Sequence, residues 1–560
     1  MKFRLMIFVF AILGAASHLV AQSFAKVNIN NISTFLYDDG RMDIDYKTGL
    51  SGFKLPQAAE KFTYYTSGFH WGGLIDSEIR VGGTKYSSSL KSGWIDADGN
   101  AQQPTGEIKI FRVRPDYPFV NIDTEIKDEN RSEAEIRQQY IHDYLKWPVN
   151  LGAPFKDVNG DNKFTEGLDI PGYPDANQTL WFVANDQLPY NNSGVNFPFY
   201  SKPTGLELQV TVWAYSHQSQ LSNCIFKSFK LINKSKTQFI KDMYVGMFCD
   251  IDIGEAVNDL VGCDTTLNLG YLYNGSDSET AIGNNLPVTG YVLLKGPTVN
   301  GSLNDYVIVD GKKVFGKKNL KMSSFNPFPR RYVCDYCDPA PANPKNYYQA
   351  FLGLNMWTGV PFVDSTKDIP TRFPYSGDPK SNTGWLDEIL DQNRERQFQI
   401  NSGPFNMAPG DTQEVVFAQL AYTGMKQKEN VTYLKYLTKI AAEFFNASHF
   451  GLPNNVVEKD KIPTEFSLEQ NYPNPFNPET TISYTIPSNV KGETINVTLK
   501  VYDVLGREVA TLVDEFKQPA NYKVKFNVET RHGASLQSGV FFYTLTANSF
   551  TQTKKMMLIK

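Results

Sequence analysis

Short runs in which apolar and polar residues alternate fill the last hundred residues, and they restrict this part of the chain to a β fold. In residues 497–502, Val497, Leu499 and Val501 alternate with Thr498, Lys500 and Tyr502, which is the period of a half-buried strand. Turn residues separate similar runs at 480–486, 495–502, 508–513, 521–526, 540–547 and 554–559. Six or seven short strands in about a hundred residues predict a small, immunoglobulin-like β-sandwich over residues 465–560.

Two local signals accompany these strands. Residues 471–478 (NYPNPFNP) contain three prolines, which fix φ and remove backbone donors, so we expect a stiff extended segment rather than a helix. Residues 503–507 (DVLGR) predict a tight turn at Gly506.

Four motifs in this order at the chain end resemble the type A C-terminal sorting domain of the type IX secretion system of Bacteroidetes and their relatives. They are NYPNPFNPETTI, VYDVLGREVATLV, SGVFFYTL and KKMMLIK. Positions within them include Pro473, Asn474, Pro475, Phe476, Gly506, Gly539, Lys554 and Lys555. The resemblance implies partners in the type IX translocon and its sortase, passage across the outer membrane, and removal of the domain with anchoring or release of the cargo.

The N-terminus predicts export independently of those motifs. Lys2 and Arg4 precede an apolar run at residues 5–13, and the small residue Ala21 suits a cleavage site. This pattern predicts a signal peptide over residues 1–21. The apolar run is too short for a comfortable membrane span, and no later stretch qualifies, so no transmembrane anchor is expected. We therefore expect a protein that is secreted or located at the cell surface.

The region between these signals, residues 22–446, predicts a β-rich cargo of one large β-sandwich or two, with few helices and a subdivision near residues 205–220. Residues 447–464, with Pro453 and Pro463, predict a linker to the sorting domain. Fragments such as TSGFHWGG and SGPFNMAPGDTQEVV resemble uncharacterised secreted proteins that carry this kind of domain, and that resemblance implies architecture alone.

Several elements of the cargo are predicted individually. Ser132 and Glu135 form a capping-box pattern before a helix over residues 132–146. Asn430 is expected to cap a second helix, to about residue 445, whose apolar stripe packs on the sheet. Residues 224–232 and 239–249 predict two strands of one hairpin, and residues 347–356 predict a buried strand.

The charge pattern argues against nucleic acid as a partner, because the net charge is −4 and no basic block stands out. Extracellular glycan or cell-surface polysaccharide is the expected alternative, since aromatic faces suit sugar rings. His70 and Trp71 predict either such a sugar platform or a packed turn.

The most specific cargo motif is an acidic loop over residues 157–169. Oxygen-bearing side chains at its first, third and fifth positions match the start of an EF-hand-like or dockerin-like Ca²⁺ loop. The sixth position is Asn162 instead of Gly and the twelfth is Leu168, so Glu166 or Asp169 would close the site; a solvated turn is the alternative. The candidate ligands are Asp157, Asn159, Asp161, Lys163, Glu166 and Asp169.

A second acidic cluster follows the strand that ends near residue 250. Asp250 and Asp252 are two residues apart and lie on one side of a strand end. With Asp259 and Asp264 they predict a second cation site. Alternatively, two of the three carboxylates Asp250, Asp252 and Glu255 would serve as the acid/base pair of a glycoside hydrolase. The third possibility is a polar loop without such a site.

Five cysteines in an exported chain predict oxidation. Cys334 and Cys337 are close enough to bridge within a loop. Cys249 pairs either with Cys263 or with Cys224 in the predicted hairpin, and the sequence leaves this choice open.

The sequence contains no GxSxG or HExxH motif and no locally supported Cys/His pair. We therefore expect a calcium-stabilised, non-enzymatic binding, adhesion or envelope protein. A secreted glycan-active hydrolase that uses Asp250, Asp252 or Glu255 is the alternative.

Overall fold

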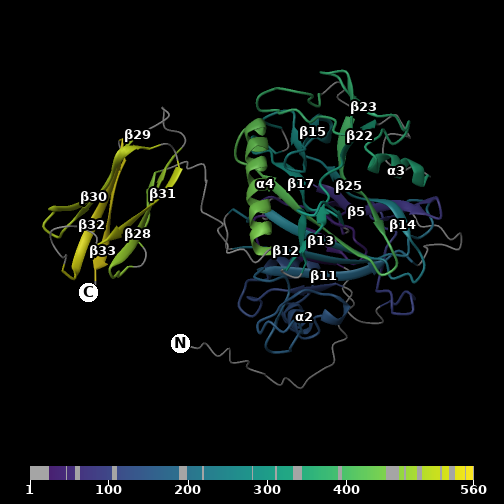
Figure 1. The fold of residues 1–560 in the computed structure, drawn as a ribbon, viewed down its shortest axis with the longest axis horizontal. Coiled ribbons are helices and arrows are strands. Elements are labelled where there is room, and N and C mark those ends of the chain that lie inside the picture. The colour runs from purple at the N-terminus through teal and green to yellow at the C-terminus, as the bar shows by residue number, and fades with distance from the viewer. Residues whose placement is uncertain are drawn as a thin grey trace. The chain divides into compact units, whose positions relative to one another are not determined.

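The computed structural model describes most of the chain and divides into two compact units, residues 1–450 and 451–560 (Figure 1). The described residues are 24–45, 47–56, 64–103, 110–187, 198–216, 220–279, 282–309, 312–331, 343–388, 394–449, 466–471, 474–487, 495–517, 520–528, 537–548 and 550–558. The predicted signal peptide lies outside these ranges.

The larger sheet of the first unit comprises nine strands, and its neighbours pair antiparallel. In spatial order it contains β15 (Asp259–Asp264), β16 (Leu269–Asn274), β17 (Val288–Lys295), β26 (Thr412–Tyr422), β13 (Cys224–Ile232), β12 (Glu207–Ala214), β11 (Gln178–Asn185) and β7 (Lys91–Ser92), with β8 (Phe111–Val113) beside β11.

The smaller sheet comprises five antiparallel strands. They are β22 (Ser324–Arg331), β25 (Arg394–Met407), β14 (Ile240–Ile251), β5 (Tyr64–Ile75) and β6 (Glu78–Gly83). Short pairs surround the two sheets: β1 (Phe24–Val27) with β2 (Thr34–Tyr37), β3 (Ile44–Asp45) with β4 (Leu50–Ser51), β9 (Phe155–Lys156) with β10 (Ile170–Pro171), β18 (Thr298–Asn300) with β21 (Lys317–Asn319), β19 (Tyr306–Val309) with β20 (Lys312–Phe315), and β23 (Phe362–Asp364) with β24 (Ile369–Thr371).

The main core lies between these two sheets. Alternate residues of the strands, such as Val210 and Val212 of β12, turn towards it and are buried. Phe69 of β5 stacks on Phe229 of β13, with ring centroids 4.3 Å apart and planes at 12°. This contact joins one sheet directly to the other.

The helix with the predicted capping box is confirmed as α2 (Glu133–Leu145). The Ser132 hydroxyl accepts from the Glu135 amide, and the Glu135 carboxylate accepts from the Ser132 amide at 2.8 Å. Ile136 and Tyr140 are buried, and α1 (Asp123–Glu129) packs beside α2.

The second predicted helix is α4 (Gln427–His449), which contacts β16, β17 and β26 on the outer face of the large sheet (Figure 1). The predicted stripe is buried there: Leu434, Leu437, Ala441 and Phe444. Asn430 is not the cap, because the helix starts earlier; its side chain instead accepts from the Met425 amide. The helix extends into the predicted linker, and residues 450–465 lie outside the described ranges.

Two predictions of local structure were wrong. Residues 344–351 form helix α3 (Pro344–Phe351) rather than a strand, because Asn343 caps the Lys345 amide and Pro344 favours the first helical turn. The strands β13 and β14 do not form a hairpin: residues 233–239 carry the chain from the large sheet to the small one.

The second unit contains two antiparallel sheets around a core of its own. One contains β27 (Ser467–Leu468), β28 (Glu479–Ile486) and β31 (Ala520–Asn527); the other contains β30 (Glu508–Lys517), β29 (Ile495–Tyr502), β32 (Gly539–Ala547) and β33 (Phe550–Leu558). The predicted alternation is visible in β29, where Val497, Leu499 and Val501 are buried. The mainly-β fold class is confirmed for both units.

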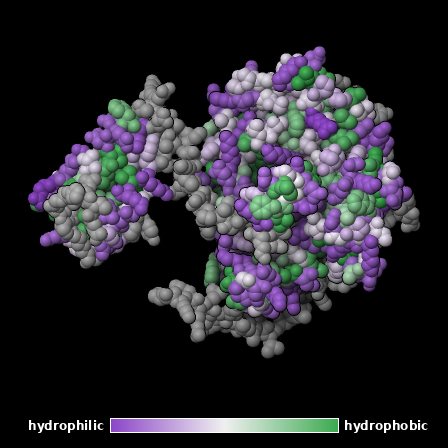
Figure 2. All heavy atoms as spheres, in the orientation of Figure 1, coloured by the Kyte–Doolittle hydropathy of each residue, from purple (hydrophilic) through white to green (hydrophobic). Residues whose placement is uncertain are grey.

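Within the described ranges, no helix combines the length and apolarity needed to cross a membrane. On the face drawn in Figure 2, apolar residues form small patches among polar ones.

Because Phe229 packs between the sheets, Phe229→Ala should destabilise the first unit by about 3–5 kcal/mol. Urea unfolding followed by tryptophan fluorescence measures this change. Leu303→Ala is the control, since Leu303 is 91% exposed and its truncation should change the free energy of unfolding by less than about 0.5 kcal/mol. Equal effects of the two substitutions would contradict the assignment of the core.

Candidate functional site

The acidic loop over residues 157–169 lies between β9 and β10, which pair through Lys156 with Ile170 and Phe155 with Pro171. It is therefore the loop of a short hairpin, without the flanking helices of an EF-hand.

Backbone amides donate hydrogen bonds to the carboxylates of this loop. Asp157 accepts from the amides of Gly160 at 2.7 Å and Asn162 at 2.6 Å. The buried Asp169 accepts from the amides of Val158 at 2.8 Å and Thr165 at 2.7 Å. These bonds close the loop from both ends.

The other predicted ligands of the loop point towards solvent. Asp161 accepts from the Lys163 amide at 2.8 Å and from the Asn159 side chain at 2.9 Å. Asn159, Asp161, Lys163 and Glu166 are exposed. The amide of Asn162, followed by that of Gly160, lowers the pKa of Asp157, so this carboxylate is charged at neutral pH.

The second acidic cluster does not form a single site. Asp250 is buried on β14, whereas Glu255 is exposed, so the predicted catalytic carboxylates differ widely in exposure. Asp264 is separate from them: it accepts from Thr266 at 2.6 Å and pairs with Lys435 of α4 at 3.3 Å.

Asp259 lies near Asp252, with which the sequence analysis grouped it, and also near residues outside the predicted cluster. The β15–β16 register places Asn274 opposite Asp259. The Asn274 side-chain nitrogen lies within hydrogen-bonding distance of four oxygens. These are Glu279 Oε1 at 2.5 Å, Asn258 Oδ1 at 2.7 Å, the Ile253 carbonyl at 3.2 Å and Asp259 Oδ1 at 3.3 Å. A primary amide carries two N–H bonds, so four acceptors compete for them.

The turn before β15 wraps around Glu279. The Glu279 carboxylate accepts from the Glu255 amide at 2.7 Å. A Cβ at Gly254, whose φ is +69°, would lie 1.7 Å from Glu279 Oε2, so glycine is needed for this close approach. We name Asp252, Asp259, Asn274 and Glu279 the Asn274 cluster.

Burial is the main cause of a pKa for Asp259 well above its ordinary value. The neighbouring carboxylates Asp252 and Glu279 raise it further, against the hydrogen bond from the Ile253 amide. Within the described ranges, no three His, Cys, Asp or Glu side chains are arranged to hold a metal ion.

The predicted disulfides of Cys249 do not form. Cys224, Cys249 and Cys263 are buried free thiols. Cys224 lies opposite Leu420 in the large sheet, while Cys249 lies between Ser67 and Phe398 in the small one, because β13 and β14 belong to different sheets. Cys334 and Cys337 lie outside the described residues.

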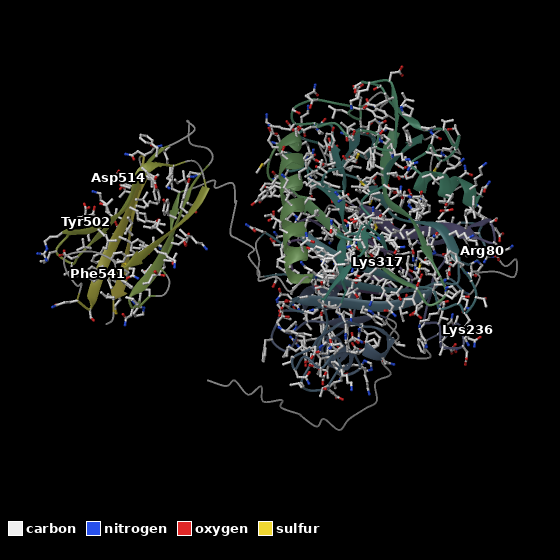
Figure 3. All side chains as sticks on the ribbon, in the orientation of Figure 1. Arg80, Lys236, Lys317, Tyr502, Asp514 and Phe541 are labelled. Carbon is white, nitrogen blue, oxygen red and sulfur yellow. The ribbon has the colours of Figure 1, made fainter. Side chains whose placement is uncertain are left out.

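Open cavities of about 470, 460 and 390 Å³ occur in the first unit, and Asp250, Asp252 and Glu255 line none of them. Arg80 and Lys236, labelled in Figure 3, contribute to the first cavity. His70 and Trp71 are fully buried in β5, so they form no sugar platform.

The sorting-motif residues hold the second unit together. Asn474 accepts from the Met557 amide at 2.8 Å, which ties the proline-rich segment to β33. Phe476 is buried, and the centroid of its ring lies 5.9 Å from that of Phe526. Gly506 adopts φ +76° in the DVLGR turn, where the Asp503 carboxylate accepts from the amides of Leu505 and Arg507.

The remaining motif residues belong to the last two strands of this unit. Gly539 pairs with Leu558, while Lys554 and Lys555 pair with Tyr543 and Phe542. Pro475 precedes Phe476 in the described chain, and Pro473 lies outside the described residues.

Residues 470–560 match the family model of the secretion system C-terminal sorting domain, which confirms the resemblance. Such a domain marks proteins that are secreted or attached to the cell surface, and it implies interaction with the type IX secretion machinery. No curated protein matches the chain.

Comparisons with solved structures give low scores. A polysaccharide lyase matches at 9% identity and a TM-score of 0.18, covering 63% of this chain and 34% of the lyase. Dimeric latent PorU from Porphyromonas gingivalis matches at 11% identity and a TM-score of 0.15, covering 63% of this chain and 26% of PorU. This chain thus spans about a third of the lyase and a quarter of PorU.

The raised pKa of Asp259 predicts a pH dependence. A carboxyl whose pKa is higher in the folded state contributes stability below its unfolded pKa, and this contribution is lost as the pH rises through the folded pKa. Asp259→Asn cannot ionise, so it should raise the free energy of unfolding at pH 7 above that of the wild type, and the difference should shrink towards pH 4. Urea unfolding in chelating buffer, measured at intervals between about pH 4 and about pH 8, tests this effect.

Asp264→Asn is the matched control. Burial alone would raise the pKa of Asp264, but Thr266 and the charge of Lys435 hold it below its ordinary value. Its contribution is therefore present at neutral pH and lost in acid, so this substitution should destabilise the protein at pH 7. An Asp259→Asn variant less stable than the wild type at pH 8 would contradict the role given to Asp259.

Proposed function

We propose that this protein is a type IX secretion cargo whose first unit acts by binding, adhesion or envelope structure rather than by catalysis. The match of residues 470–560 to the sorting domain carries the export part of the proposal. The N-terminal signal-peptide pattern supplies the step across the inner membrane.

The distribution of carboxylates favours a non-enzymatic role. A glycoside hydrolase needs two carboxyl groups that face one substrate across the scissile bond. Asp250 is buried, Asp252 is half-buried near Asp259, and Glu255 is exposed. The hydrolase alternative therefore has no pair of candidate residues that share a described cavity.

Ca²⁺ is the proposed cofactor, bound at the loop of residues 157–169. Support comes from the hard oxygen ligands that Ca²⁺ prefers, supplied by the charged Asp157 and the exposed Asp161, Asn159 and Glu166. The Asn274 cluster is the second candidate, since a cation there would relieve the repulsion among Asp252, Asp259 and Glu279.

Deletion of residues 466–560 should leave the cargo inside the cell envelope. The signal peptide still directs inner-membrane passage, whereas the outer-membrane step lacks its signal. Expression in a bacterium with type IX machinery, followed by fractionation and immunoblotting, measures the location, and the full chain is the control. Recovery of the deletion variant in the medium or on the cell surface would refute the export proposal.

Chelation by EGTA should lower the melting temperature of the purified protein. At a free Ca²⁺ concentration of about 100 times Kd, binding would add about 2.7 kcal/mol to the free energy of unfolding. Asp157→Asn should abolish the calcium response if the ion lies in the loop of residues 157–169, whereas Glu279→Gln should abolish it if the ion lies in the Asn274 cluster.

The matched control for this experiment is Asp96→Asn. Asp96 also accepts from two amides of an exposed turn, those of Asp98 and Asn100, but it belongs to neither acidic cluster. This variant should keep the calcium response. A melting temperature that EGTA leaves unchanged would exclude a stabilising calcium ion.

A further inference from the structure

A group of polar side chains lies in the middle of the core between the two sheets. Its members come from the segment before β3 and from β2, β5, β13, β17 and β26, and each is at most 2% exposed. We name this group the Asp43 cluster: Asp43, Thr34, Ser67, Lys227, Tyr291 and Gln419.

The Asp43 carboxylate is held by donors from several strands. Its Oδ1 accepts from the Thr34 hydroxyl at 2.5 Å. Its Oδ2 accepts from the Ser67 hydroxyl and from the Gln419 side-chain amide, the latter at 3.2 Å. Asp43 adopts φ +70°, an uncommon conformation for a residue with a side chain, which indicates that its surroundings fix its position.

Lys227 points at the same carboxylate. Its Nζ lies 3.8 Å from Asp43 Oδ1, beyond hydrogen-bonding distance, and donates to the Tyr291 hydroxyl at 2.5 Å. Removing two opposite charges from water is unfavourable, and their attraction offsets this cost only where the geometry is good. Burial lowers the pKa of Lys227, and the charge of Asp43 opposes this effect.

Hydroxyl groups connect the amine to the carboxylate. The Tyr291 hydroxyl lies 2.9 Å from Ser67 Oγ, which in turn donates to Asp43 Oδ2. A proton can therefore pass from Lys227 through Tyr291 and Ser67 to Asp43 without entering the apolar core.

We propose that Lys227 and Asp43 condense into an intramolecular amide cross-link. The Lys227 nitrogen attacks Asp43 Cγ, and the Thr34 hydroxyl stabilises the negative charge that develops on Oδ1. The bond between Cγ and Oδ2 then breaks, and Oδ2 leaves as water with the two protons that the ammonium loses. No electrons are transferred, and no co-reactant is needed.

The cross-link would join the N-terminal segment to β13, a strand in the interior of the large sheet. It would also replace two buried charges by one neutral amide. This inference does not depend on the calcium proposal, because none of its residues belongs to either acidic cluster.

Tryptic digestion of the denatured full-length protein, with mass spectrometry of the peptides, tests the proposal. The expected product joins the peptide around Asp43 to that around Lys227, lighter than their sum by one water, with no cleavage after Lys227. Recovery of the two linear peptides with cleavage after Lys227 would overturn it.

Lys85 provides a control within the same digest. It is as buried as Lys227, but its Nζ lies over the Phe248 ring at 4.0 Å, and trypsin should cleave after it in the denatured chain. Tyr291→Phe keeps the ring and removes the hydroxyl, so its cross-linked fraction should rise at least about tenfold more slowly than that of the wild type in samples taken after a pulse of synthesis, as expected for a lost proton-transfer group. Equal rates in this variant and the wild type would refute the proton path.

Discussion

The first unit depends on the contact between its two sheets. Phe69 and Phe229 stack across this contact, and the strands on both sides supply alternate apolar residues to one continuous core. The Asp43 cluster lies within that core and draws its members from both sheets. Apolar packing tolerates small shifts in register, whereas buried hydrogen bonds do not, so this cluster specifies how the sheets align.

Local patterns predicted the elements whose cause is local. The alternation of Val497, Leu499 and Val501 gave the correct faces of β29, and Ser132 with Glu135 gave the start of α2. Asn343 and Pro344 form a local start signal for α3, but the apolar residues that follow them also fit the predicted strand. The pairing of β13 was predicted wrongly for another reason: strands adjacent in sequence can belong to different sheets, and strand pattern alone does not reveal the partner.

The sequence likewise does not reveal which distant residues meet at the candidate sites. The sequence located the carboxylates of residues 250–264, but their separation depends on tertiary structure. Asn274 meets Asp259 only through the β15–β16 register, and Glu279 enters through a turn that needs glycine at position 254. In contrast, the loop of residues 157–169 folds on itself, because its backbone amides donate to Asp157 and Asp161 within the same segment.

The three buried thiols place a condition on the order of events during export. Burial raises the pKa of Cys224, Cys249 and Cys263, which suppresses the reactive thiolate. That protection exists only after both sheets have closed, and the chain must cross an oxidising compartment. Folding therefore competes in time with oxidation. A change that merely slowed sheet closure would reduce the yield through mispaired cysteines, even if the final protein were fully stable.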